Sequence, residues 1–150
     1  MVRGFTLIEL MVVLAILGIL AAAAVPFTRS WLDSSAQMQG KSLILEAIGQ
    51  SKSLALRNPH HQVSGEAVSK ITIGKEKITV TDEVSEKVVW STEFPARLSY
   101  KNEKNAAISC LEFNNRALQP LTGEGSGSCA RVQKVQIQTS TQDALYVDVM

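Results

Sequence analysis

The feature that most limits how this chain can fold is a long uncharged stretch near its N-terminus. From Leu10 to Thr28 the sequence contains no charged residue, whereas charges are scattered throughout the chain from Arg29 onward. The 21 residues from Phe5 to Val25, as a helix rising about 1.5 Å per residue, would span about 30 Å, the thickness of a bilayer core. One end of the chain is therefore suited to lipid and the remainder to water.

The bulk composition limits the size and the partners of the water-exposed part. A chain of 150 residues is long enough for one domain with a modest core. The formal net charge is +1, so the clear basic excess of a general nucleic-acid binder is absent, although a local basic patch remains compatible with it.

Two charged residues flank the beginning of the apolar stretch. Arg3 provides a positive flank, which predicts that this end stays in the cytoplasm and that the carboxyl end faces outward. Glu9 lies in the first turn of the apolar run, although a carboxylate well inside a membrane helix costs about 2.5–3.5 kcal/mol or more. The helix dipole favours a negative charge near the helix start, but a positive partner is still expected. Glu9 is therefore interpreted as a functional residue.

Two simple interpretations of this segment leave Glu9 unexplained. The run Ala21–Ala24 offers a cleavage site for an ordinary secretory signal peptide, which would release an exported globular protein cleaved after Ala24. A plain signal anchor fits the hydrophobic pattern as well. Neither has a use for a carboxylate inside the apolar run.

A third interpretation accounts for all of these features. Residues 4–9 closely resemble the class III signal of type IV pilins and type II secretion pseudopilins. That signal has a short basic leader, a Gly before the cut, a Phe after it, a Glu five residues into the mature chain, and a Pro near the end of the apolar run. The corresponding residues here are Arg3, Gly4, Phe5, Glu9 and Pro26.

The resemblance implies a processing and assembly mechanism. Prepilin peptidase would cut between Gly4 and Phe5 and methylate the new amine of Phe5, while the helix remains attached. In a filament, the Glu9 carboxylate would meet the α-amino group of Phe5 on a neighbouring subunit, because a buried charge without a partner is costly. The implied partners are other pilin or pseudopilin subunits, the peptidase, the inner-membrane assembly platform and the membrane itself.

The resemblance also implies a fold and a location. An α+β protein is expected, with a long N-terminal helix packed on a small antiparallel β-sandwich or sheet. The expected parts are a leader at 1–4, a transmembrane and assembly helix at 5–28, an amphipathic helix at 29–58 and a β-rich head at 59–150. The chain would cross the bacterial inner membrane once, with the head in the periplasm, and enter a filament. At Pro26, which lacks a backbone N–H, a kink or local melting of the helix is expected.

Beyond Pro26 the pattern predicts that the helix resumes and ends at Asn58-Pro59. Apolar residues recur every 3.5–3.6 positions, which predicts that they form a stripe on the helix that packs on the head. Its members are Phe27, Trp31, Met38, Leu45 and Ile48. Polar residues between them are expected to face water, namely Ser30, Asp33, Ser34, Ser35 and Gln37.

Alternation of apolar and polar residues predicts short strands beyond Pro59. Residues 71–73 and 78–80 form an expected hairpin around a turn at 74–76. Further strands are expected at 88–90, 98–100, 108–113, 132–137 and 145–149. Together with the preceding helix, this order resembles the GspH/FimT-like minor subunits, in which a strand ending in Phe precedes a turn, as at Phe113. Where that family usually has a Gly after the turn, this chain has Arg116-Ala117.

Cys110 and Cys129 are the only cysteines, and they enclose 18 residues. Two cysteines in an exported domain suggest one disulfide, which the resemblance supports because many type IV pilins carry one near the C-terminus. The chain-entropy treatment gives such a loop about 3 kcal/mol of stabilisation. A zinc site is not expected, since two thiols without nearby histidines fall short of a ligand set.

None of the remaining candidate residues indicates an enzyme activity or the binding of a metal or cofactor. His60-His61 is expected in an exposed loop, and the glycines at 123–127 lack the dinucleotide-binding spacing. Arg131 and Lys134, with Arg116, offer a possible basic patch for DNA. The predicted function is a minor pilin or pseudopilin that acts in filament initiation or at the tip. A DNA-binding minor pilin for DNA uptake and the ordinary exported protein remain the alternatives.

Overall fold

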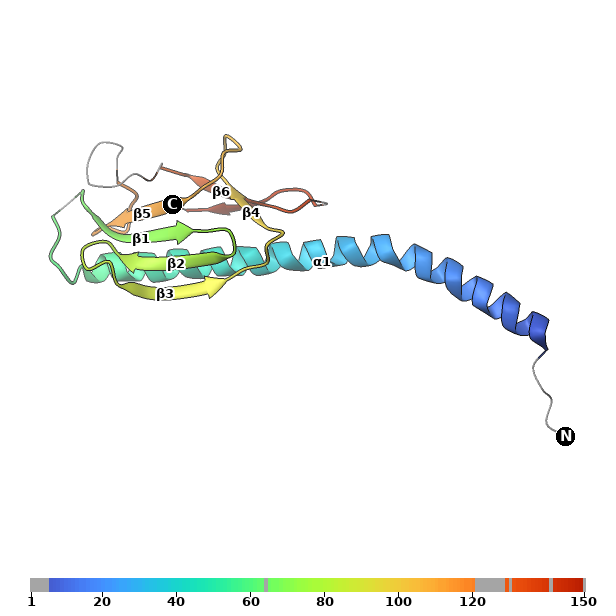
Figure 1. The fold of residues 1–150 in the computed structure, drawn as a ribbon. Helices are drawn as coiled ribbons and strands as arrows, with labels where there is room; N and C mark the ends of the chain where they lie inside the picture. Colours follow the sequence, from blue (N-terminus) through green and yellow to red (C-terminus); the bar gives the residue numbers. More distant parts are fainter. Residues whose placement is uncertain (1–5, 64, 121–128, 130, 141, 150) are drawn as a thin grey trace.

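A single helix runs through more than a third of the chain and carries a small β-rich head on its C-terminal half (Figure 1). The computed structural model describes residues 6–63, 65–120, 129, 131–140 and 142–149, with the backbone alone at 26 and 27. Helix α1 (Leu7–Arg57) is continuous over 51 residues. It runs through Pro26 without a break, so the local melting expected there does not occur. Figure 1 shows a gradual curve over the N-terminal half, and a kink at Pro26 itself stays a prediction.

Both ends of α1 have residues suited to their positions. Thr6 is the N-cap in an extended conformation, and its side chain accepts a hydrogen bond from the Glu9 N–H. Asn58 ends the helix in the left-handed conformation (φ 41°), and its N–H donates to the carbonyl of Leu54 at 3.2 Å. Asn adopts this conformation more readily than most residues, and Pro59 cannot continue a helix. The predicted end of the helix at this point is confirmed.

The described strands form two antiparallel sheets. They are β1 (Ala67–Ile73), β2 (Lys77–Asp82), β3 (Val88–Glu93), β4 (Ser99–Lys101), β5 (Cys110–Asn114), β6 (Lys134–Gln138) and β7 (Leu145–Asp148). One sheet has the order β3-β2-β1-β5 and the other the order β4-β6-β7. The expected hairpin is present, because Ile71 pairs with Val80 and Ile73 with Ile78. The α+β fold predicted from the sequence is thereby confirmed.

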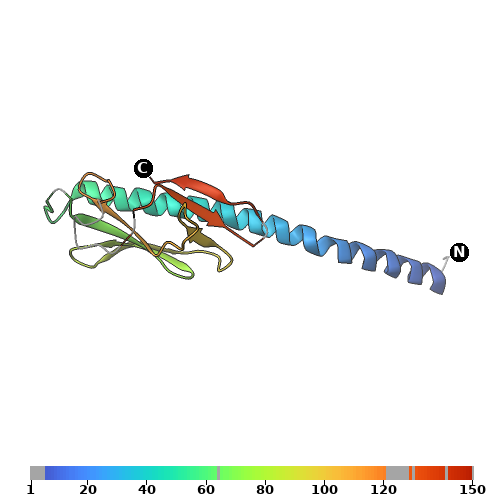
Figure 2. The same cartoon turned by 90° about the horizontal axis from the view of Figure 1, so that it is seen from above.

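The C-terminal half of α1 lies against both sheets, whereas its N-terminal half extends away from them (Figures 1 and 2). Fully buried apolar side chains fill the space between helix and sheets. The largest are Phe113, Ile44, Ile71, Ile78, Leu111 and Ile137. Small residues of the helix face this core and let the strands approach closely. A Cβ added at Gly40 would lie only 2.7 Å from Leu98 Cδ1.

The helix face that packs on the head differs from the predicted one. Of the expected stripe, Ile48 is buried, but Trp31 and Met38 are 65% and 64% exposed and Leu45 is also exposed. The prediction was wrong for these three, since the periodicity of apolar residues shows a stripe but not what covers it. The buried face instead contains smaller and polar residues: Asp33, Ala36, Gln37, Gly40, Ile44, Ala47, Ile48, Ser51 and Ala55.

Asp33 and Gln37 were expected to face water, yet both are buried because the head supplies polar partners. The Gln37 amide donates to the carbonyl oxygens of Asp143 at 2.7 Å and Ile137 at 3.3 Å. Arg97 Nη1 lies 3.2 Å from Asp33 Oδ1. A buried polar group is tolerated when it is hydrogen-bonded in this way. These contacts fix the helix to the head.

Candidate functional site: the long helix and its N-terminal carboxylate

The N-terminus of α1 holds the carboxylate of Glu9 in a capping box. Glu9 Oε2 accepts hydrogen bonds from the Thr6 N–H at 3.0 Å and from the Thr6 hydroxyl at 2.9 Å. In return, the Glu9 N–H donates to Thr6 Oγ1 at 3.3 Å. The charge therefore has two donors within its own subunit and lies at the positive end of the helix dipole.

The role of Thr6 was missed in the sequence, although a signal for it is present. A Thr followed by a Glu three positions later, just before an apolar run, is the sequence signature of a capping box. Arg3 and the predicted cleavage residues Gly4 and Phe5 lie outside the described residues. Cleavage between Gly4 and Phe5, methylation of Phe5 and the assembly role of Glu9 therefore stay predictions.

The N-terminal half of α1 presents its apolar side chains uncovered. Every described side chain from residue 6 to residue 25 is exposed, including the large ones from Leu7 to Leu20. Helix α1 is long and apolar enough near the N-terminus to cross a membrane, judged by length and composition. So much exposed apolar surface is unfavourable in water, so lipid or other protein must cover it.

An uncovered apolar stripe continues along the half of α1 that carries the head. Trp31, Met38 and Leu45 recur every seven residues, and a rotation of 100° per residue places them within about 40° of one another. Leu56 falls on the same side and is also exposed. The stripe faces away from the sheets, since Ala36, Gly40 and Ala47 on the other side are buried. We call Trp31, Met38, Leu45 and Leu56 the outer stripe.

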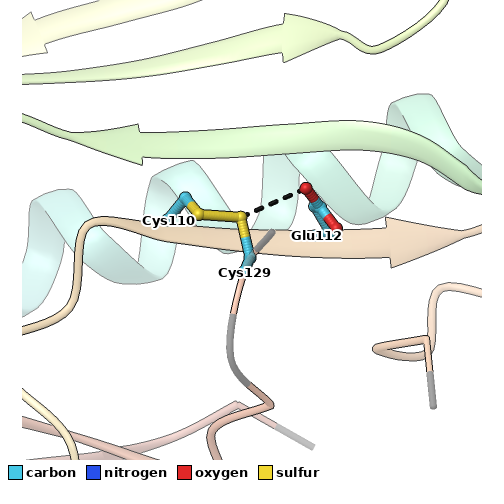
Figure 3. Close-up of side chains that lie close together, drawn as sticks. All are labelled: Cys110, Glu112 and Cys129. Carbon is cyan, nitrogen blue, oxygen red and sulfur yellow. Dashed lines mark hydrogen bonds between the residues drawn. A yellow bond between two sulfur atoms is a disulfide. The ribbon is translucent and has the colours of Figure 1, made fainter. Parts of the chain in front are cut away.

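Cys110 and Cys129 form a disulfide that joins the start of β5 to the segment before β6. Their Cα atoms are 5.3 Å apart. Beside the bond lies Glu112, whose Oε1 is 3.1 Å from Cys129 Sγ (Figure 3). A disulfide sulfur carries no proton, so Cys129 Sγ cannot donate a hydrogen bond to this carboxyl group.

The side chain of Glu112 is buried. Burial raises the pKa of the Glu112 carboxyl, and this effect outweighs the opposing influence of Lys70. Lys70 on the neighbouring strand β1 lies 3.4 Å from Glu112 and 3.5 Å from Glu83. The sulfur and carboxylate atoms of Cys110, Glu112 and Cys129 lie within 4.8 Å of one another. Because a metal binds thiolates, the oxidised pair cannot ligate one there.

The residues proposed for DNA contact are only partly available. Arg131 is exposed. Lys134 is exposed too, but its Nζ lies 3.8 Å from Asp148 Oδ1, and its N–H donates to Glu103 Oε1 at 2.6 Å. Two acidic side chains therefore lie beside Lys134 and reduce its positive potential. Contact with DNA stays a prediction.

The histidine pair lies in the expected exposed loop after α1, and among the residues that the structure describes His60 has an acidic neighbour. His60 Nε2 is 3.2 Å from Asp82 Oδ2. Burial alone would raise the pKa of Asp82, but the N–H groups of Ser85 and Val84, together with His60, hold it below its usual value. This arrangement fixes the turn after β2.

The geometry thus defines a class of protein: a chain with one long N-terminal helix, apolar enough in its first half to cross a membrane, and a small β head, which is the type IV pilin-like architecture. Residues 1–25 match the family described as "Prokaryotic N-terminal methylation motif". A type IV major pilin protein PilE1 of Neisseria gonorrhoeae is 33% identical over 93 residues, covering 51% of this chain and 42% of that protein. A second protein with the same description is 33% identical over 96 residues, covering 53% and 56%.

The type IV major fimbrial protein FimA of Dichelobacter nodosus is 54% identical over 41 residues, which cover 27% of this chain and 26% of FimA. The chain spans about half the length of the PilE1 relatives that it matches. No solved structure matches the chain. The N-terminal motif and these relatives confirm the predicted resemblance to the type IV pilin superfamily over the matched part of the chain.

Proposed function

We propose that this chain is a minor pilin or pseudopilin, anchored in the bacterial inner membrane with its head in the periplasm. It would assemble with other pilin or pseudopilin subunits into a type IV pilus or a type II secretion pseudopilus. It would act in filament initiation or at the tip, and prepilin peptidase and the inner-membrane assembly platform would be its processing and assembly partners.

The observation that carries this proposal is the uncovered apolar surface along α1. The N-terminal half needs a nonpolar environment before assembly, which a membrane provides. The outer stripe extends this surface along the head-bearing half, on the side that the head leaves open. Each large apolar side chain contributes about 1.5–3 kcal/mol when it becomes fully buried. Neighbouring helices in a filament would bury the stripe and the membrane segment together.

In this proposal, Glu9 sets the axial position of each subunit relative to its neighbour in the filament. In the single subunit, the donors of Thr6 satisfy the carboxylate. In a filament, the α-amino group of Phe5 on a neighbouring subunit would neutralise it. The positively charged amine would interact more strongly with the Glu9 carboxylate than the neutral Thr6 donors do, because the site contains no water. A subunit placed at the wrong height would leave both charges without partners, which is strongly unfavourable.

The turn after β5 is where this chain departs from the GspH/FimT-like pattern, which weakens the assignment to that subfamily. The Asn114 side chain accepts hydrogen bonds from the N–H groups of Arg116 and Leu118 at 3.0 and 3.1 Å. Ala117 lies in the left-handed region with φ 57°, a conformation that suits Gly much better than Ala. The turn therefore contains a position that suits Gly, which this chain fills with Ala.

The test replaces Glu9 by Ala in the full-length protein expressed in its host. We expect normal cleavage and membrane insertion, but loss of the subunit from sheared filaments or from the pseudopilus. Glu46→Ala is the matched control, since Glu46 is also an exposed acid on α1 but lies beyond the membrane segment. Normal incorporation of Glu9→Ala would exclude the assembly role of Glu9.

A further inference from the structure

The head first contacts α1 only a few residues beyond the apolar run. The Gln142 amide donates to the Ser30 carbonyl at 3.2 Å and to its hydroxyl at 2.9 Å. Arg97 and Ser140 reach Asp33 at 3.2 and 3.3 Å. The hairpin between β6 and β7 extends furthest toward the N-terminal half of the helix (Figure 1). Arg97, Ser140 and Gln142 form what we call the base of the head.

The rise per residue of the helix gives the depth in a membrane at which these contacts lie. A carboxylate is costly in hydrocarbon, so Glu9 is placed at the inner headgroup layer and the uncharged run from Leu10 to Thr28 in the hydrocarbon. At about 1.5 Å per residue this run spans about 28 Å, close to the hydrocarbon thickness of a bilayer, and the polar headgroup layer adds about 6 Å on each side, or about four residues of helix. Residues 29–32 then lie at the depth of the outer headgroups, with Asp33 at the outer edge of that layer. The base of the head contacts α1 within this interval.

The side chains at this depth suit a membrane–water interface on the open side of the helix. Trp31 is exposed and lies about 200° around the helix from Asp33, so it faces away from the head. Trp concentrates at the headgroup level, where its ring meets apolar groups and its N–H meets polar ones. Arg29 is exposed one turn below Asp33 and has a side chain long enough to extend toward phosphates.

We propose that, before assembly, Arg29 and Trp31 anchor α1 at the outer phospholipid headgroups, and that the base of the head rests on the same headgroup layer. This inference rests on the proposed function, because it requires the subunit to reside in a membrane. Trp31 meets lipid on one side of the helix and the base of the head meets it on the other. The Arg97 side chain, which is 48% exposed beside Asp33, would face the phosphates.

Such contact fixes the height and the tilt of the head. Helix α1 continues through residues 29–33 without a flexible linker, and the polar contacts of Ser30 and Asp33 prevent the head from turning freely about it. Assembly would then lift Trp31 out of the headgroup layer and transfer the outer stripe from lipid and water to protein.

The test measures the depth of Trp31 in the full chain, reconstituted at low density in phosphatidylcholine vesicles. The two tryptophans are separated by the variant Trp90→Phe, which retains Trp31, and by Trp31→Phe, which retains Trp90. Quenching is compared between vesicles with a nitroxide on the choline headgroup and vesicles with a nitroxide at the middle of the acyl chain. If Trp90→Phe does not fold, the wild type minus Trp31→Phe gives the Trp31 signal.

We expect the headgroup nitroxide to quench Trp31 more strongly than the mid-chain nitroxide, and neither to quench Trp90. Equal or stronger quenching by the mid-chain label would place Trp31 in the hydrocarbon and overturn the inference. Absence of quenching by both labels would place it in water or under protein, with the same consequence. Flotation of the same vesicles tests the proposed function separately, since a chain that does not float with lipid is not a membrane subunit.

Discussion

The close contact of α1 with the second sheet at Gly40 can be tested against a second glycine of the same helix. A Cβ at Gly40 would lie 2.7 Å from Leu98 Cδ1 and 3.2 Å from the Tyr100 hydroxyl oxygen. Both side chains are buried, and the Tyr100 hydroxyl donates to the Gly40 carbonyl at 3.3 Å. A Cβ at Gly49 would meet no atom within 4 Å.

Replacement of either glycine by Ala gains the same helix propensity, about 1 kcal/mol. At Gly40 the added methyl group must displace Leu98 and Tyr100, and overpacking of this kind costs about 1–3 kcal/mol. The propensity term cancels between the two variants. We therefore expect Gly40→Ala to be less stable than Gly49→Ala by about 1–3 kcal/mol, with Gly49→Ala more stable than the wild type.

The assay is urea unfolding in detergent micelles of the full chain carrying Trp31→Phe, so that the emission followed is that of Trp90. For a chain of this length, 1 kcal/mol corresponds to a shift of about 2–4 °C in the thermal midpoint, which provides a second measurement. Equal stabilisation of the two alanine variants would refute the close approach of α1 to β4, and with it the packing of the helix on the head.

Three further predictions concern the head. Replacement of both Cys110 and Cys129 by Ser should lower the free energy of unfolding by about 3 kcal/mol in non-reducing urea titrations, and a change below about 0.5 kcal/mol would count against the bond. Ala117→Gly should raise stability by up to about 1 kcal/mol by relieving the left-handed conformation, and a loss of stability would contradict that backbone shape. The lowered folded-state pKa of Asp82 means that its stabilisation exists above the ordinary value, about 4, and is lost as the pH falls through the folded value. The urea midpoint of Asp82→Asn should therefore fall less steeply than that of the wild type from neutral to acidic pH, and identical slopes would exclude this role.

The sequence was sufficient for the features that depend on local pattern. The apolar run from Phe5 to Val25, with Glu9 in its first turn, predicted the long helix, because few other structures tolerate that composition. Alternation around the turn at 74–76 predicted the hairpin of β1 and β2, since side chains of a strand alternate between its faces. Asn58-Pro59 marked the end of the helix through backbone preferences alone.

The sequence was not sufficient to show which face of α1 the head covers. Both faces carry apolar residues, and the periodicity favoured the larger ones at Trp31, Met38 and Leu45. The head instead packs on small residues, which allow close approach, and it supplies partners for Asp33 and Gln37. Those partners come from more than 60 residues further along the chain, so no local pattern reports them. The large residues remain outside, where another molecule can cover them.

For the candidate site, the sequence predicted which residues matter and how they are spaced, but few of their contacts. The spacing of residues 4–9 indicated the pilin signal, and Glu9 stood out through its charge. The part of Thr6 in holding the Glu9 carboxylate was also readable from the sequence as a capping box. By contrast, the proximity of Glu112 to the disulfide depends on the pairing of β1 with β5 and on the return of the chain before β6, which the sequence does not specify.

The processed N-terminus of the mature protein tests the central claim most directly. Mass spectrometry of the protein from its host membrane should find a chain that begins at Phe5 with a methylated α-amino group, with the helix still attached. A chain that begins near Val25, or one that keeps Met1, would contradict the account of a processed pilin subunit whose freed amine pairs with Glu9 of a neighbour.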